Sequence, residues 1–376
     1  MPSLCTSAVS EQDKREVMYN YEVFAATIRE HYAFMELNNI NWDLLYEQKR
    51  EELANAPTEV NLYRTLEETL DTLGDNHAYL EADEALYTSM ELNATTEENT
   101  AEEQLPEYGD FQIANLVAEH HLVEDMTQAS WLMKWGKLTD KLGYLAVKAM
   151  WLYADLEVPQ TLIDEMGYVD AFVSTFQQMD EGTYVDQEVK GAARIMDRVM
   201  ADLENTQAIV IDLRFNGGGQ DAVSFEILRR FNPNREKIVT AKWKHKEGYS
   251  PVHVIHLPAE QAAYTKPIYI LISPQTGSAA EAFAIASKAL DHTKLVGSSS
   301  LGATSTSLEK KLPNGWSFAI SNEVYMDTIG QNYENVGVPV VYDFDYPRDR
   351  QAFFRSVAND LEADKRDILR MINNLE

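Results

Sequence analysis

The amino-acid sequence predicts an α/β (α+β) protein, in which an N-terminal helical bundle precedes a core with a mostly parallel sheet. In residues 11–75, apolar side chains recur at steps of three and four, which is the period of an amphipathic helix. Residues 208–213 and 266–273 are continuous apolar runs, which are typical of strands buried on both faces. Because such strands alternate with helical segments along the second half of the chain, a parallel arrangement is favoured.

The N-terminal bundle is predicted to occupy residues 1–84 and to contain three helices. Residues 40–45 indicate a turn into the second helix, with Asn41 or Asp43 near its cap. The third helix is predicted over residues 58–70. The first helix carries one apolar stripe, which consists of Val17, Tyr21, Phe24, Ala25 and Ile28.

The remaining chain is divided into a linker or cap region at residues 85–140 and a core at residues 141–376. Within the core, residues 155–184 form an insert whose pattern indicates no particular element. The other elements expected are a strand at 142–147, an amphipathic helix at 185–205, a polar hairpin at the sheet edge at 238–257, strands at 294–297 and 316–324, and a terminal helix at 348–376.

Composition argues against several classes of partner. The 376 residues include 32 basic and 61 acidic side chains, a net charge of −29, whereas nucleic acids and anionic membranes bind basic faces. We expect much of this acidity, including residues 97–103, to lie on solvated loops. No run of 18 apolar residues exists, so no membrane span is predicted. The single cysteine, Cys5, allows no intrachain disulfide.

The stretch TGSAAE at residues 276–281 has two interpretations. Ser278 and Glu281 fit S-x-x-E, the capping box of a helix N-terminus. The same position also suits a nucleophile, because free backbone N–H groups and the positive end of the helix dipole would stabilise an oxyanion there. Taken alone, the stretch favours the cap.

Other polar motifs are equally ambiguous by themselves. The glycine run at 217–219 fits neither G-x-G-x-x-G nor a P-loop, so it indicates a tight turn or a backbone donor that a ligand approaches closely. The eight histidines form no H-E-x-x-H motif and no cysteine set indicates zinc, so no metal site is predicted. His77 ends an amphipathic helix, where a structural role is the commoner one.

The combination of motifs resembles peptidase family S41, the group of C-terminal processing, tricorn and interphotoreceptor retinoid-binding proteins. Residues 212–219, DLRFNGGG, are similar to the family's DLR-x-N-x-GG turn, and residues 278–281 are similar to its nucleophile motif. Residues 295–302 resemble the family's strand and glycine loop. Residues 334–339 resemble its late glutamate element, and residues 73–80 resemble its histidine element. All five occur in family order.

A histidine and a late glutamate point to the tricorn-like branch of that family. The processing branch uses a Ser-Lys dyad, but Ala303 occupies the position of its lysine, and Lys310 and Lys311 lie too far along the chain. The tricorn-like branch uses a histidine base and a glutamate, for which His77 and Glu334 fit. A PDZ-like module, common in the processing branch, is not evident.

The resemblance implies a crotonase/ClpP-like ββα catalytic core and a serine peptidase site without metal or cofactor. Ser278 is the implied nucleophile, His77 the general base, and Glu334 the carboxylate that stabilises the imidazolium. The backbone N–H groups of Gly218 and Ala279 are the implied oxyanion donors. The remaining candidates are Asn76 for orienting His77, and Asp75 and Asp291 as spare orienting acids.

The predicted function is therefore peptide-bond hydrolysis by a serine peptidase that acts on peptides or unfolded proteins. A homo-oligomer is left open. The alternative is a non-catalytic ligand- or peptide-binding protein on the same scaffold, with Trp131, Trp135 and Trp151 lining an apolar pocket. No signal peptide is visible at the N-terminus. The resemblance nevertheless favours a bacterial periplasmic or secreted protein, its signal removed, over a cytoplasmic one.

Overall fold

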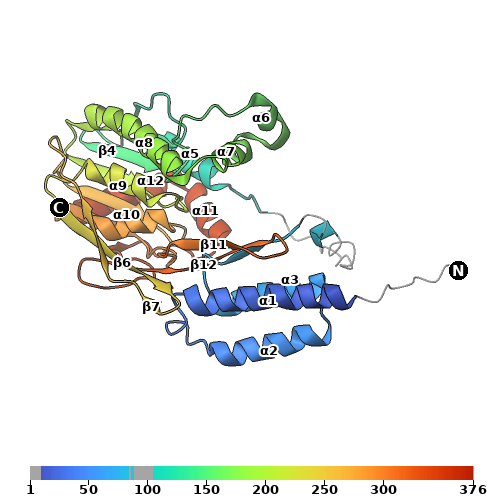
Figure 1. The fold of residues 1–376 in the computed structure, drawn as a ribbon. Helices are drawn as coiled ribbons and strands as arrows, with labels where there is room; N and C mark the ends of the chain where they lie inside the picture. Colours follow the sequence, from blue (N-terminus) through green and yellow to red (C-terminus); the bar gives the residue numbers. More distant parts are fainter. Residues whose placement is uncertain (1–9, 84–85, 89–104, 376) are drawn as a thin grey trace. The chain divides into compact units, whose positions relative to one another are not determined.

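The computed structural model describes residues 10–83, 86–88 and 105–375 (Figure 1). The chain forms two compact units, each described by itself below. The segments of unit 1 are Met1–Gln104, Ala241–His253 and Ser305–Val324, and those of unit 2 are Leu105–Thr240, Val254–Thr304 and Tyr325–Glu376. Unit 1 thus includes two segments that fall within the predicted core, 241–253 and 305–324. The predictions for Cys5 and for the acidic loop at 97–103 lie outside the described residues.

The N-terminal part of unit 1 folds into three helices, α1 (Glu11–His31), α2 (Trp42–Asn55) and α3 (Glu59–Leu73). Each begins at a capping side chain, since Ser10, Asn41 and Thr58 accept hydrogen bonds from N–H groups of the first turn. Gly74 ends α3 in the left-handed conformation, with φ of 61°. The predicted apolar stripe of α1 is buried, so the three predicted helices are confirmed.

An antiparallel sheet packs against these helices within unit 1. Its strands, in the order β1-β12-β11, are Tyr79–Glu81, Ser317–Ser321 and Ser307–Lys311. Phe318 of β12 contacts Phe24 of α1, with ring centroids 4.9 Å apart, and both belong to one buried core. This packing anchors both ends of the short segment between α3 and β1, which contains His77.

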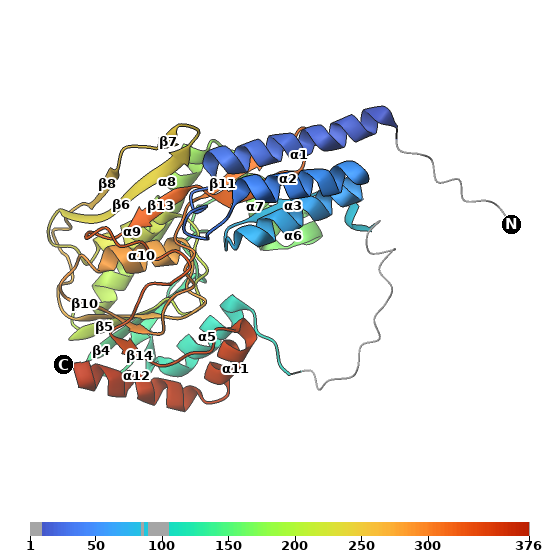
Figure 2. The ribbon, with the colours of Figure 1, turned by 90° about the horizontal axis from the view of Figure 1, so that it is seen from below.

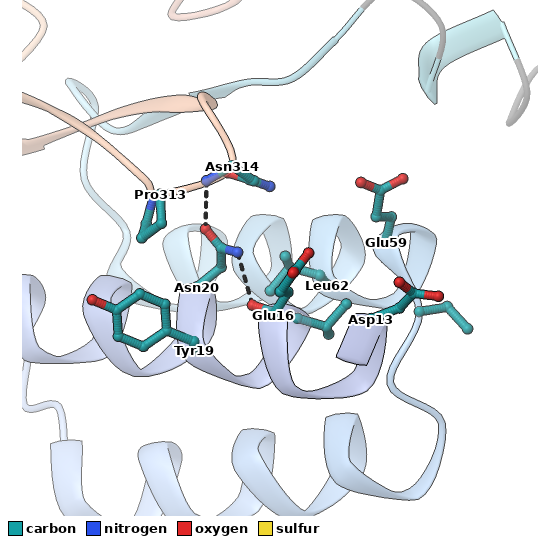
Figure 3. Close-up of a pocket in the computed structure, with 10 residues that line it drawn as sticks. Asp13, Glu16, Tyr19, Asn20, Glu59, Leu62, Pro313 and Asn314 are labelled. Carbon is teal, nitrogen blue, oxygen red and sulfur yellow. Dashed lines mark hydrogen bonds between the residues drawn. The ribbon is translucent and has the colours of Figure 1, made fainter. Parts of the chain in front are cut away.

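A cavity of about 700 Å³ lies between α1, α3 and the turn that joins β11 to β12 (Figure 3). The carboxylates of Asp13, Glu16 and Glu59 line it. At its back, Asn20 accepts a hydrogen bond from the Asn314 N–H at 2.9 Å and donates one to the Glu16 carbonyl at 2.8 Å. The first bond fastens the β11–β12 turn to α1, and the second holds the Asn20 side chain in place within α1.

The residues predicted as a polar hairpin, 238–257, do pair antiparallel, but in a sheet separate from the main one. They form β6 (Glu236–His245), β7 (Gly248–Tyr249) and β8 (His253–Leu257). Both β7 and β8 pair with β6, on whose other side lies β13 (Glu323–Met326). The single strand predicted over 316–324 is therefore wrong, because it divides into β12 and β13. Asn322 occupies the break, where its side chain donates to the carbonyls of His31 and Lys244.

Unit 2 is built on a seven-stranded sheet in the order β14-β10-β9-β5-β4-β3-β2. The strands from β14 to β4 run parallel, and β3 and β2 continue the sheet antiparallel, which confirms the mostly parallel prediction. Every residue of β5 and β9 is buried, as expected for central strands. The strands are β2 (Glu124–Asp125), β3 (Met133–Lys137), β4 (Leu142–Val147), β5 (Ala208–Asp212), β9 (Ile268–Ile272), β10 (Thr293–Gly297) and β14 (Tyr342–Asp343).

Helices cover both faces of this sheet (Figures 1 and 2). One face carries α8 (Glu181–Leu203), α9 (Asp221–Arg229) and α10 (Ala279–Ser287), and the other carries α5 (Asp110–His121), α11 (Arg350–Ala358) and α12 (Leu361–Leu375). On the second face, Ile368 and Met371 of α12 share a buried cluster with Tyr144 and Leu271 of the strands. The predicted insert contains α6 (Gln160–Met166) and α7 (Tyr168–Phe176).

The single terminal helix predicted over 348–376 is also wrong, because α11 and α12 are separate helices. α11 has its C-cap at Asn359, and the Asp360 side chain then accepts a hydrogen bond from the Ala363 N–H at 2.8 Å. This side chain caps a new helix start, which helical periodicity alone does not reveal. Among the described helices, none is both long enough and apolar enough to cross a membrane.

Candidate active site

Ser278 lies in unit 2 at the turn between β9 and α10. Its φ of 52° and ψ of −124° are rare for a non-glycine residue, and such a conformation costs on the order of 1–3 kcal/mol. The half-buried side chain makes no capping hydrogen bond to α10. The Ser278 N–H donates to the Ala303 carbonyl at 3.0 Å and to Glu281 Oε2 at 3.2 Å. Two hydrogen bonds thus hold the Ser278 backbone in place, while the Ser278 hydroxyl itself does not cap the helix.

Gly218 packs directly against this serine. A Cβ at Gly218 would lie 2.7 Å from the Ser278 Cβ and 3.0 Å from the Ala279 nitrogen, and φ is 115°, so only glycine fits. The Gly218 N–H donates to Asn216 Oδ1 at 2.9 Å. Ala279 is the first residue of α10, so its N–H has no acceptor within the helix. The two predicted oxyanion donors are therefore neighbours, and one of them is bonded to a side chain.

A buried ion-pair network anchors the turn that contains Gly217, Gly218 and Gly219, which is called the glycine turn below. The Arg214 guanidinium is fully buried and lies 2.7 Å from a carboxylate oxygen of Asp212 and 2.7 Å from one of Asp364. Burial by itself would raise the pKa of Asp364, but the Arg214 charge and a hydrogen bond from His121 hold that pKa well below its usual range. The network joins the end of β5 to α12 and α5.

Side chains also tie the glycine turn to the turn that carries Ser278. The Ser273 hydroxyl donates to the Arg214 carbonyl at 2.5 Å, and the Thr276 hydroxyl donates to the Leu213 carbonyl at 2.8 Å. The Gly277 N–H adds a third bond, to the Asn216 carbonyl at 3.1 Å. Two neighbouring parallel strands thus end in turns that are held in one fixed arrangement.

Glu281 forms the other half of the S-x-x-E pattern, but it does more than accept from Ser278. Its carboxylate is buried and also accepts hydrogen bonds from the Ser300 hydroxyl at 2.5 Å and from the Gly302 and Ala303 N–H groups at 2.7 and 2.8 Å. Burial raises the pKa of Glu281 to about 7, although these hydrogen bonds oppose the rise. A local capping pattern does not indicate such long-range partners.

Glu334 is likewise buried in unit 2. Its Oε2 accepts from both the N–H and the hydroxyl of Thr304, at 2.7 and 2.8 Å, and its own N–H donates to Asn332 Oδ1. The next residue, Asn335, adopts a left-handed conformation and donates its N–H to the Gly302 carbonyl at 2.7 Å. The loop at 300–304 therefore contacts both Ser278 and the Glu334 segment.

His77 belongs to unit 1, where it follows α3 and precedes β1. Asp75 accepts from the His77 N–H at 2.9 Å and from the N–H and hydroxyl of Ser321, both at 2.7 Å. Burial lowers the pKa of the His77 imidazole, and the negative charge of Asp75 partly offsets this. Within the described residues, the buried Nδ1 atom has no hydrogen-bond partner. Because the pKa of the imidazole is lowered, the ring is neutral near pH 7, which is the form that can accept a proton.

The other candidates lie in different surroundings. Asn76 is exposed, and Asp75 is the residue that bonds to the His77 backbone. Asp291 is exposed beyond the C-terminal end of α10, which is the end opposite Ser278. Lys310 and Lys311 are exposed on β11 of unit 1. Of the predicted aromatic pocket, Trp135 is fully buried and donates to Asp202 at 2.8 Å, which is a structural contact.

Comparisons with known proteins agree on the fold. Residues 165–342 match Peptidase family S41. The chain is similar to a putative peptidase from Parabacteroides merdae, with 15% identity over 92% of this chain and 96% of that one, and a TM-score of 0.62. It is also similar to mature CPAF, with 13% identity over 97% and 99% of the two chains and a TM-score of 0.63.

A lipoprotein from Streptococcus agalactiae shares the fold at 12% identity, over 91% of this chain and 95% of that one, with a TM-score of 0.53. A comparison with curated proteins finds no significant match. None of these matches supports the ligand-binding alternative. The structural matches confirm the predicted α/β class, and the family match over residues 165–342 supports a peptidase. The similarity to peptidase family S41 extends over residues 165–342.

Proposed function

We propose that this protein is a serine peptidase in which Ser278 attacks the scissile carbonyl, His77 is the general base and Glu334 stabilises the charged imidazole. The observation that carries the proposal is the Ser278 turn. A strained non-glycine backbone presents a hydroxyl that caps nothing, at the N-terminus of α10 and against a glycine that no other residue could replace. Strain of this kind persists only where the surrounding structure enforces it, and it is common at active sites.

The surroundings of Ser278 suit an oxyanion. The Ala279 N–H is one donor, assisted by the positive end of the α10 dipole. The Gly218 N–H is the second, and a developing oxyanion would compete with Asn216 Oδ1 for it. Each such donor contributes about 3 kcal/mol to transition-state stabilisation when it is preorganised.

A serine hydroxyl needs an adjacent base, because it is a weak nucleophile near pH 7. The lowered pKa of His77 keeps its imidazole neutral and able to take the Ser278 proton. The proposal requires units 1 and 2 to present these two residues to the same substrate. This use of histidine, instead of lysine, is the feature of the tricorn-like branch.

The reaction then runs in two halves. Ser278 Oγ bonds to the substrate carbonyl carbon as its proton moves to His77, and His77 returns this proton to the leaving amine as the peptide bond breaks. Water, deprotonated by His77, next releases the acyl group and restores the serine. The Glu334 carboxylate stabilises the imidazolium in both halves. The substrate is a peptide or an unfolded protein.

The proposal is tested by treating the protein with a fluorophosphonate, which forms a stable bond with activated serines, and by mapping the adduct with mass spectrometry. We expect labelling at Ser278 that Ser278→Ala and His77→Ala abolish or strongly slow. Ser307→Ala and His256→Ala, which alter an exposed serine and an exposed histidine, are the matched controls. A folded wild type that is never labelled at Ser278 would contradict the proposal.

A further inference from the structure

The loop at residues 300–304 connects the nucleophile to the proposed catalytic glutamate within unit 2. At one side, the Ala303 carbonyl accepts the Ser278 N–H at 3.0 Å. At the other, Thr304 donates both its N–H and its hydroxyl to Glu334 Oε2. The loop therefore sets the positions of both residues at once, and whatever holds the loop holds the site.

The Glu281 carboxylate bonds to three residues of this loop, Ser300, Gly302 and Ala303. Oε1 accepts from the Ser300 hydroxyl and the Gly302 N–H, and Oε2 accepts from the N–H groups of Ala303 and Ser278. A carboxylate offers about four lone-pair sites, two on each oxygen. All four are used, so a proton on either oxygen would displace one of the bonds that join α10 to the loop.

The directions of these bonds require an ionised acceptor. The Ser300 oxygen accepts the Val338 N–H at 2.6 Å, so its hydroxyl hydrogen points to Glu281. The backbone N–H groups can only donate. Every partner thus supplies a hydrogen, and an amide or a protonated carboxyl at this position would place a hydrogen against another donor.

The loop also transmits its position to the Glu334 segment by close packing. A Cβ at Gly337 would lie 2.3 Å from the Ser300 carbonyl oxygen, so the two backbones touch. The Asn335 N–H donates to the Gly302 carbonyl at 2.7 Å. A displacement of the loop therefore cannot leave Glu334 in place.

We propose that Glu281, as a carboxylate, is a positioning residue that couples Ser278 to Glu334 through the loop at 300–304. This inference rests on the proposed function and deepens it. Glu281 transfers no proton to the substrate. It fixes the backbone on which the nucleophile, the adjacent Ala279 N–H and the Glu334 carboxylate depend.

The protonation of Glu281 gives this role a distinct pH signature. Burial raises its pKa to about 7, and hydrogen bonds from the uncharged donors Ser278, Ser300, Gly302 and Ala303 oppose the rise. The titratable group on the packed segment, Glu334, is bonded to Thr304 instead. Activity should therefore fall as the pH drops through about 7, above the pH at which His77, with its lowered pKa, takes up a proton.

The test measures the rate of fluorophosphonate labelling at Ser278 from pH 5 to pH 9 for wild type, Glu281→Gln, Thr304→Val and Thr304→Ser. Glu281→Gln should slow labelling about 100-fold at pH 8, the effect of a small misplacement of reacting groups. On the acidic side of the pH profile, the labelling rate of Glu281→Gln should fall at a lower pH than that of wild type, because only His77 remains to titrate. Thr304→Val should slow labelling about tenfold, and Thr304→Ser should restore most of that loss because it keeps the hydroxyl.

Glu51→Gln, an exposed change on α2, is the matched control and should leave rate and pH profile unchanged. Wild-type labelling together with a Glu281→Gln rate and acidic limb equal to those of wild type would overturn the inference and leave the proposed function intact. An unlabelled wild type would instead contradict the proposed function itself. Should Glu281→Gln fail to fold, equal rates for Thr304→Val and Thr304→Ser would still overturn the coupling.

Discussion

Ser278 and His77 each follow a regular element, but the protein holds the two turns in different ways. The Ser278 turn is bonded to the glycine turn, to Glu281 and to the loop at 300–304, and Arg214 anchors the whole arrangement. The His77 turn depends on one carboxylate, Asp75, and on the left-handed Gly74 that ends α3. Within the described residues, several side chains therefore hold the turn of the proposed nucleophile, whereas Asp75 is the side chain that bonds to the backbone of the proposed base.

The largest expected effect on stability is at the anchor of the Ser278 turn. Asp364→Asn removes one of the two carboxylates that face the fully buried Arg214. Arg214 keeps Asp212 as a charged partner, so the loss should be smaller than the about 3–5 kcal/mol of a fully unpaired buried charge, but the denaturant midpoint should still fall clearly. Asp367→Asn, an exposed change on the same helix, is the control. Equal midpoints for the two variants would show that the anchor contributes nothing.

The next effect compares two glycines that both have positive φ. Gly218→Ala places a methyl group 2.7 Å from the Ser278 Cβ, whereas Gly74→Ala meets no atom within 4 Å. We expect a loss of labelling rate of about 100-fold or more for Gly218→Ala. Gly74→Ala should cost only the conformational strain of about 1 kcal/mol. Similar labelling rates would contradict the close approach of the glycine turn to the serine.

A smaller effect is expected at the tether of His77. Asp75→Asn keeps one acceptor but removes the charge that raises the pKa of the imidazole. The pKa of His77 should fall further, and activity should drop about tenfold as the turn loosens. An NMR titration of the His77 ring measures the first effect, and Asp71→Asn, exposed on α3, is the control. An unchanged or higher His77 pKa would contradict the electrostatic role of Asp75.

The smallest effect is on the pH dependence of stability. The pKa of Glu281 is raised from about 4.5 to about 7 in the folded protein, so the folded state binds this proton more tightly than the unfolded state. Its contribution to the free energy of unfolding is present below pH 4.5 and is lost as the pH rises through 7. Urea unfolding at pH 5 and pH 8 should show a smaller decrease for Glu281→Gln than for wild type. If the free energy of unfolding decreased as much for Glu281→Gln as for wild type, the pH dependence would come from other groups.

The sequence located the features that depend on local pattern. The helices of the bundle, the buried strands and the glycine turn all follow from periodicity and from residues with special backbone freedom. The turn at Ser278 also follows, because S-x-x-E after an apolar run marks a strand-to-helix junction. The pattern could not decide which of the two side chains makes the capping contact. In the structure it is the Glu281 carboxylate, which accepts the Ser278 N–H.

Features that depend on distant partners could not be predicted. Arg214 pairs with Asp364, 150 residues away, and Glu281 bonds to a loop about 20 residues later. Neither leaves a periodic trace in the sequence. The terminal helix and the strand at 316–324 were predicted too long for a related reason, since single polar residues, Asp360 and Asn322, break patterns that otherwise continue.

The central claim, that His77 of unit 1 is the base for Ser278 of unit 2, is tested most directly by chemical rescue. Fluorophosphonate labelling of His77→Ala would be measured with and without added imidazole, which can occupy the space of the missing ring. We expect slow labelling of Ser278 that imidazole accelerates, and no acceleration for wild type or for Ser278→Ala. Labelling of His77→Ala at the wild-type rate without imidazole would contradict it.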